Sequence, residues 1–218
     1  MQLALALCTA VLAGVAIGAA VHLLMHRSQP RDAAAAAATA ATAPGSLQGQ
    51  ARWGAGVRPA PAIRGLHDQT GRLFAMSALR GHTVVIAFFD SHCNQACPLE
   101  GRALAAAEDA LPAAQRPVLV VVSVNPQDTA ASSRAAASKW GLGQVGAWHW
   151  LRGTHAQLAR AWSAYHIAVL PPRNGDIAHT EALYLVDRRG DERSAYLYPF
   201  AAHFVTHDLR TLSRGSTA

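Results

Sequence analysis

The stretch TVVIAFFDSHCNQACP, residues 83–98, carries most of the architectural information in this chain. It begins with a continuous apolar run, rich in β-branched and aromatic side chains, which is typical of a strand buried on both faces of a sheet. Two cysteines with three residues between them, Cys93 and Cys97, follow the run. Pro98 comes next and suits an early helical position. The stretch therefore predicts a buried strand, a loop with both sulfurs, and a helix.

Outward from this stretch, strand-like apolar runs alternate with segments of helical spacing. Helices are expected over 98–111, 155–165 and 201–213, and within 125–143. The helix within 125–143 has Asp128 or Thr129 as its expected N-cap and Gly141 near its C-terminus, and Thr154 is the expected cap of the helix over 155–165. Strands are expected over 117–124, 147–153, 182–187 and 193–199, and two short strands within 66–79, with a turn near Thr70 and Gly71. This alternation indicates an α/β fold, a central mixed sheet flanked by helices, with an antiparallel hairpin late in the chain.

From Leu3 to Met25 the N-terminus carries no formal charge and is apolar except for Thr9 and His22, and this segment is long enough to cross a bilayer as a helix. We therefore expect residues 1–27 to be a transmembrane anchor, with a cleaved signal segment as the alternative. Cys8 lies inside this segment and is interpreted as a small apolar residue of the anchor. Arg27 and Arg31 follow the segment, and by themselves they would favour a cytoplasmic domain.

Residues 28–58 are rich in Ala and Gly and lack the branched and aromatic side chains of a core, which predicts a low-complexity tether. The folded domain is expected over 59–213, followed by a tail over 214–218. The formal net charge is +6, yet the arginines are scattered and Lys139 is the single lysine. Without a basic helix face or a basic and aromatic stripe, we expect no nucleic-acid partner.

The cysteine pair admits several chemistries. Near the start of a helix, the free N–H groups and the dipole favour a thiolate. A structural disulfide would close a very short loop and contribute little stability. A structural zinc site would usually need more Cys or His ligands than this domain offers nearby. A thiol–disulfide couple and a copper site, in which two thiolates and one imidazole suit Cu(I), remain open.

The imidazole of a copper site would have to come from one of 11 histidines. His92 is adjacent to Cys93, but next neighbours in sequence tend to point apart. His179 stands out because it lies in the irregular segment RNGDIAHT, just before the buried run ALYLVD. A loop that enters one central strand can lie beside the loop that leaves another.

Four segments together resemble the Sco/SenC family: FFDSHCNQACP, VVVSVNPQDT, WHWLRGTHAQLARAW and DIAHTEALYLVDRRG. The resemblance covers about residues 60–212 and implies a thioredoxin-like fold with an N-terminal membrane anchor. It also implies that Cys93, Cys97 and His179 bind one copper ion, as Cu(I) and also as Cu(II). Members of this family help to assemble the CuA centre of cytochrome c oxidase, and their domain lies on the outer face of the membrane.

Two functions follow as expectations. The first is a metallochaperone that delivers copper to a subunit of cytochrome c oxidase or to another envelope cuproprotein. The alternative is an envelope thiol–disulfide oxidoreductase, in which Cys93 and Cys97 are the redox-active pair, His179 is dispensable, and a thiol reductant is a further partner. A peroxiredoxin-type peroxidase is disfavoured, because the chain lacks that family's P-x-x-x-T-x-x-C pattern.

Overall fold

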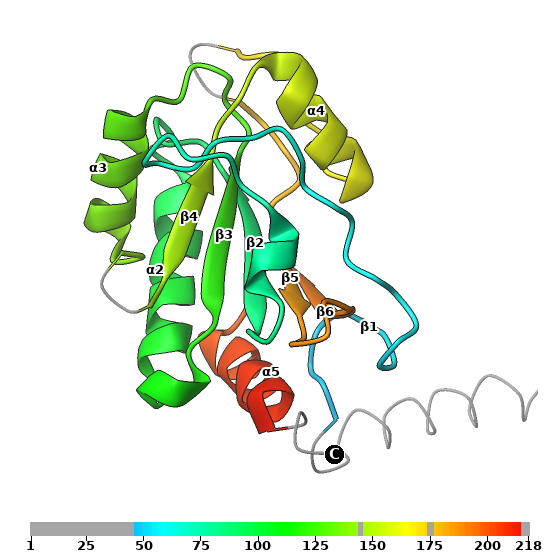
Figure 1. Ribbon diagram of the computed structural model, residues 1–218. Coiled ribbons are helices and arrows are strands. Elements are labelled where there is room, and N and C mark those ends of the chain that lie inside the picture. Colours follow the sequence, from blue (N-terminus) through cyan, green and yellow to red (C-terminus); the bar gives the residue numbers. More distant parts are fainter. Residues whose placement is uncertain (1–45, 144–145, 174–176, 215–218) are drawn as a thin grey trace, which may run out of the picture. The chain divides into compact units, whose positions relative to one another are not determined.

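The computed structural model describes residues 46–143, 146–173 and 177–214 (Figure 1). Its centre is a six-stranded mixed sheet with the order β1-β6-β5-β2-β3-β4. The strands are β1 (Ala51–Arg52), β2 (Val84–Phe89), β3 (Val118–Ser123), β4 (Trp148–Leu151), β5 (Ala182–Val186) and β6 (Glu192–Leu197). The helices are α2 (Ala96–Asp109), α3 (Ala130–Trp140), α4 (His155–Ala164) and α5 (Ala202–Arg214), with 3-10 turns at Met76–Leu79 and Ala113–Gln115.

Strand direction divides the sheet into two halves. β2, β3 and β4 run parallel to one another. β5 is antiparallel to β2, and β6 and β1 continue the antiparallel half. The predicted mixed α/β sheet and the late hairpin, which is β5–β6, are confirmed.

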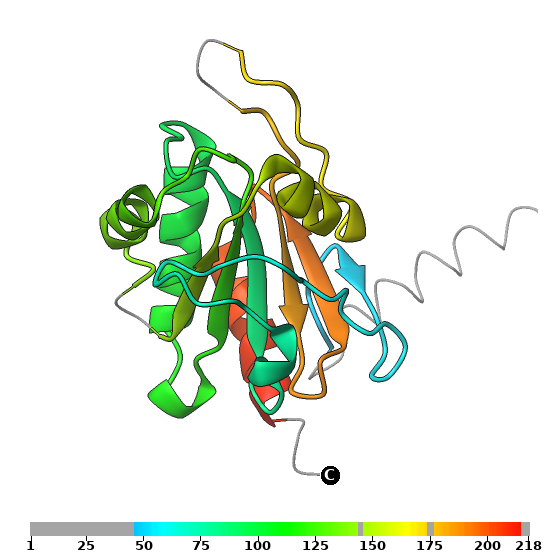
Figure 2. The same cartoon turned by 45° about the horizontal axis from the view of Figure 1, so that its top comes forward.

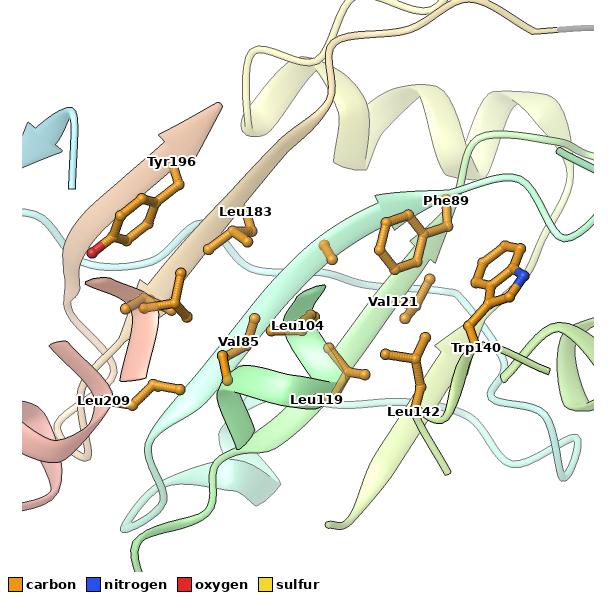
Figure 3. Packing of buried hydrophobic residues seen from close by; sticks show 14 of the residues in the cluster. Val85, Phe89, Leu104, Leu119, Val121, Trp140, Leu142, Leu183, Tyr196 and Leu209 are labelled. Atoms are coloured by element: carbon orange, nitrogen blue, oxygen red, sulfur yellow. The ribbon is translucent and has the colours of Figure 1, made fainter. Parts of the chain in front are cut away.

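Alternate residues of β2 enter different cores, because successive side chains of a strand point to opposite faces. Val85 and Phe89 pack on one face with residues of α2, α3 and α5 (Figure 3). Ile86 and Phe88 pack on the other face with residues of α4 and of the segment before β2. Every residue of β2 is buried, which explains why its sequence is continuously apolar.

The ends of α3 follow from local sequence. Thr129 is its N-cap: the side chain accepts a hydrogen bond from Ser132 N, and the Ser132 hydroxyl oxygen accepts one from Thr129 N. Gly141 ends the helix with a φ of 82°, a left-handed conformation that glycine adopts without steric cost. Thr154 caps α4 in the same reciprocal way with Gln157. The predicted caps are confirmed, with Thr129 rather than Asp128 at the start of α3.

Residues 66–79 differ from the expected pair of strands. His67 forms only isolated bridges, and a 3-10 turn occupies Met76–Leu79. The reason is Asp68, whose carboxylate accepts hydrogen bonds from the backbone N–H and the hydroxyl of Thr70. Such a side chain offers the backbone an alternative to a strand ladder. The expected turn near Thr70 and Gly71 is confirmed, with Gly71 N donating to Asp68 O over 3.0 Å.

The folded domain includes residues that the sequence analysis assigned to the tether. Leu47 is buried in the core, and β1 pairs with β6. Gln48 N and Gly49 N both donate to the carboxylate of Asp208, which is fully buried. A buried carboxylate requires hydrogen-bond donors, so Asp208 holds this segment against the sheet.

The N-terminal prediction falls outside the part that the structure describes. Residues 1–27, expected as the anchor, are not among the described residues, nor are 215–218 of the expected tail. Within residues 46–143, 146–173 and 177–214, we find no helix with the length and apolar character needed to span a membrane.

Candidate functional site

The two cysteines lie where β2 gives way to α2. β2 ends at Phe89, and the chain turns so that Cys93 N donates to Asp90 O over 3.1 Å. Cys97 is the second residue of α2, whose first-turn N–H groups have no partner within the helix. Cys93 is partly exposed, whereas Cys97 is 1% exposed. Both are free thiols.

His179 reaches the cysteines because β2 and β5 are antiparallel. Ala87, near the end of β2, pairs with Leu183, near the start of β5. The segment that enters β5 is therefore at the same end of the sheet as the segment that leaves β2 (Figure 2). A bridge between Val169 and His179 fixes the approach to β5. The expectation that these two loops are neighbours is confirmed.

The imidazole of His179 is oriented for coordination through Nε2. Its Nδ1 lies 3.0 Å from the carbonyl oxygen of Thr180, a contact in which the ring N–H donates. That bond selects the tautomer with an unprotonated Nε2, which lies 3.9 Å from Cys97 Sγ. Metal bonds of about 2.3 Å to sulfur and about 2.0 Å to nitrogen can span such a distance with one ion between the two atoms.

A pocket opens over these residues. Cys93 and His179 line it together with Gln95, Ala96, Ile177, Ala178 and Glu181. Cys93 is partly exposed, and Cys97, which is buried, is not part of the lining. The sulfur of Cys93 and the ring of His179 are therefore accessible from solvent, and the second sulfur is sheltered.

The pKa values of the two thiols are shifted in opposite directions. The hydrogen bond from Cys97 is the main cause that lowers the pKa of Cys93 to about 6, and backbone N–H groups assist. The same hydrogen bond keeps the proton on Cys97, and together with burial it raises the pKa of that thiol. Burial lowers the pKa of His179, which favours the neutral imidazole that a metal needs. The site therefore has one cysteine that ionises readily, Cys93, and one imidazole that favours its neutral form, His179.

Sequence reasoning missed the acidic residues around this site. Glu100 is fully buried one turn after Cys97, and neither of its carboxylate oxygens has a hydrogen-bond partner. Burial raises the pKa of Glu100 to about 8, and the nearby charge of Glu181 adds to the shift. The available signal was its position three residues after Cys97, which places both on one helix face.

The fold and the site together define a class: a thioredoxin-like α/β domain that presents two thiols and one imidazole at the carboxyl ends of its parallel strands. The SCO1/SenC family model matches residues 65–214, so the chain belongs to the SCO1/SenC family. A search of curated proteins finds no match.

Solved structures agree with this assignment at the level of the fold. ScoI of Bradyrhizobium japonicum with copper bound is 24% identical, with a TM-score of 0.57, covering 71% of this chain and 99% of that one. Copper-bound yeast Sco1 is 20% identical, with a TM-score of 0.59, covering 70% and 87%. BsSco, described as a member of the Sco family of cytochrome c oxidase assembly proteins with a disulfide switch, is 18% identical, with a TM-score of 0.61, covering 76% and 99%.

Proposed function

We propose that this chain is a copper chaperone that binds one copper ion through Cys93, Cys97 and His179. The observation that carries the proposal is the 3.9 Å approach of His179 Nε2 to Cys97 Sγ, with Nδ1 held by the Thr180 carbonyl. Two thiolates and one imidazole form a soft donor set that selects Cu(I), and Cu(II) is a second form that this set can hold. The copper-bound structures of ScoI and yeast Sco1 support copper as the ion.

Loading requires both sulfurs in the reduced state. Cys93 is mostly ionised at neutral pH because its pKa is about 6, whereas Cys97 releases its proton only when the ion binds. Oxidation of the pair to a disulfide would abolish copper binding. Copper occupancy is therefore coupled to the redox state of these two residues.

Delivery follows from the open pocket. Because Cys93 and His179 line the pocket and are only partly buried, ligands of a docked partner can replace them one at a time while Cys97 still holds the ion. We propose that the partner is the CuA-bearing subunit of cytochrome c oxidase, or another envelope cuproprotein. The support is membership of the SCO1/SenC family and the description of BsSco as belonging to an oxidase assembly family.

The location of the domain is part of the same proposal. Residues 1–27 would anchor the chain in the cell membrane as a single-pass helix, with residues 28–46 as a spacer. The domain would lie on the outer face, where an envelope cuproprotein is accessible. The sequence from Leu3 to Met25, which is apolar except for Thr9 and His22, supports this arrangement.

Substitution of His179 tests the copper site. The reduced full-length protein is titrated with Cu(I) against a competing chelator. We expect His179→Ala to weaken Cu(I) binding by at least about tenfold, because one of three ligands is lost. His82→Ala is the matched control, since His82 is exposed in the loop before β2, at the far end of that strand from the cysteines. Wild-type affinity in His179→Ala would refute the three-ligand site.

A second candidate function is reduction of a disulfide in a target metalloprotein. The observation that favours it is the difference in acidity within the pair: the pKa of the partly exposed Cys93 is lowered, and that of the buried Cys97 is raised. Cys93 would attack the target disulfide and form a mixed disulfide, releasing one target thiolate. Cys97 would then lose its proton and attack Cys93, releasing the second target thiolate and leaving a Cys93–Cys97 disulfide for a dithiol reductant to restore. This activity would survive His179→Ala, which separates it from copper binding.

A further inference from the structure

We propose that Asp90, His92 and Asp128 form a second metal site, separate from the two sulfurs, that binds a divalent Cu²⁺ or Zn²⁺ ion. Asp90 follows β2 directly and His92 lies two residues further on. Asp128 comes from a different part of the chain, between β3 and the N-cap of α3. The carboxyl ends of two adjacent parallel strands thus bring the three side chains together.

One nitrogen of His92 and one carboxylate oxygen each of Asp90 and Asp128 lie close enough together to bind the same metal ion. His92 Nδ1 lies 3.5 Å from Asp90 Oδ1 and 3.2 Å from Asp128 Oδ1. One donor atom from each residue lies within 4.8 Å of the other two. Bonds of about 2.0–2.2 Å from one metal ion to nitrogen and carboxylate oxygen fit these separations.

Charge also favours a cation here. Asp90 is 2% exposed and Asp128 is 7% exposed, so both carboxylates are shielded from water. In the described part of the chain, the nitrogen base within ion-pair distance of both carboxylates is the imidazole of His92. A divalent ion would neutralise the two buried carboxylates.

Surrounding hydrogen bonds already fix the carboxylates. Asp128 Oδ2 accepts from the hydroxyl of Ser123 over 2.5 Å and from Trp150 Nε1 over 3.3 Å. Asp90 Oδ1 accepts from Asn125 Nδ2 over 3.0 Å. These partners orient the carboxylates before any ion arrives, as outer partners do in metal sites. The side chain of His92 is 51% exposed, which leaves the site open to solvent.

The donor set determines the kind of metal. One imidazole nitrogen and two carboxylate oxygens suit Cu²⁺ and Zn²⁺, whereas Cu(I) prefers sulfur. Cu²⁺ should bind more tightly than Zn²⁺ in the usual order of divalent metals. The chain would then carry two neighbouring metal sites, one with soft sulfur ligands and one with harder nitrogen and oxygen ligands. This inference does not depend on the copper site of Cys93, Cys97 and His179.

The test is made on a full-length protein without thiols, in which Cys8, Cys93 and Cys97 are each replaced by Ser. This protein is titrated with Cu²⁺, and separately with Zn²⁺, against a chromophoric chelator. We expect one equivalent of Cu²⁺ to bind, with an electron paramagnetic resonance spectrum of single-nitrogen coordination. His92→Ala and Asp90→Asn should each weaken this binding by at least about tenfold.

Two controls make the outcome decisive. His203→Ala removes a histidine of α5 that lies one turn from His207, and it should leave the tight equivalent unchanged. Thermal unfolding checks that each variant is folded. Should Asp90→Asn fail to fold, His92→Ala decides alone, because its ring is half exposed. Cu²⁺ binding that survives His92→Ala, or that is lost equally in His203→Ala, would overturn the proposal.

Discussion

Two cysteines four residues apart differ in acidity because their surroundings differ. Cys97 is enclosed by the core and donates to Cys93, so its own ionisation would cost both desolvation and that hydrogen bond. Cys93 accepts this bond and backbone N–H bonds at the mouth of the pocket, all of which favour its thiolate. The sequence shows the pair, but burial decides which sulfur reacts first.

The acidity of Cys93 can be measured through its reaction with iodoacetamide. Because the thiolate is the nucleophile, the rate should rise with pH through a midpoint near 6 and level off above it. Cys97→Ala removes the main hydrogen bond to Cys93, so the midpoint should move upward by a pH unit or more. The rate is followed by mass spectrometry of the peptide that contains Cys93, with free cysteine as the reference. A midpoint near that of free cysteine in the wild type would contradict the assignment.

Among elements, those with strong local signals were predicted best. β2 and β3 were recognisable from continuous apolar runs, and α3 and α4 from their capping residues. The segment 66–79 was predicted as strands, but its form depends on hydrogen bonds to one buried carboxylate, Asp68. β1 was missed because its two residues pair only when β6 is in place.

The N-cap of α3 gives a test at the scale of the element. Thr129→Ala removes the side-chain acceptor for Ser132 N and should lower the free energy of unfolding by about 1 kcal/mol. Thr129→Ser keeps the hydroxyl and should remain near wild type. Urea unfolding followed by circular dichroism measures both variants, and equal stability of the Ala and Ser variants would show that the cap contributes nothing.

The core of the folded domain contains ionisable side chains as well as apolar ones. Glu108 is 1% exposed on α2, and burial raises its pKa to about 8 despite the nearby Arg116. In the unfolded chain this carboxyl ionises near 4.5. Folding therefore favours the protonated form, so its contribution to stability is complete below pH 4.5 and is lost as pH rises toward 8.

Glu108→Gln keeps the shape of the side chain and removes its ionisation. The wild-type protein should lose stability between pH 5 and pH 8, and the variant should lose less, by on the order of 2 kcal/mol. Chemical unfolding at both pH values measures the difference. Gln115→Ala is a suitable control, because Gln115 follows α2 and carries no ionisable group. The same pH dependence in wild type and Glu108→Gln would contradict the burial of a protonated carboxyl.

The sequence by itself determined the succession of the central strands and helices along the chain, the caps of α3 and α4, and the cysteine pair at the start of a helix. These features depend on residues close together in the chain, which periodicity and capping patterns reveal. The approach of His179 to Cys97, 3.9 Å apart across 82 positions of sequence, required the antiparallel pairing of β2 with β5. The convergence of Asp90, His92 and Asp128 likewise required the parallel pairing of β2 with β3. Only the folded sheet decides such contacts, because strand pairing and burial set both the distances between remote side chains and their acidities.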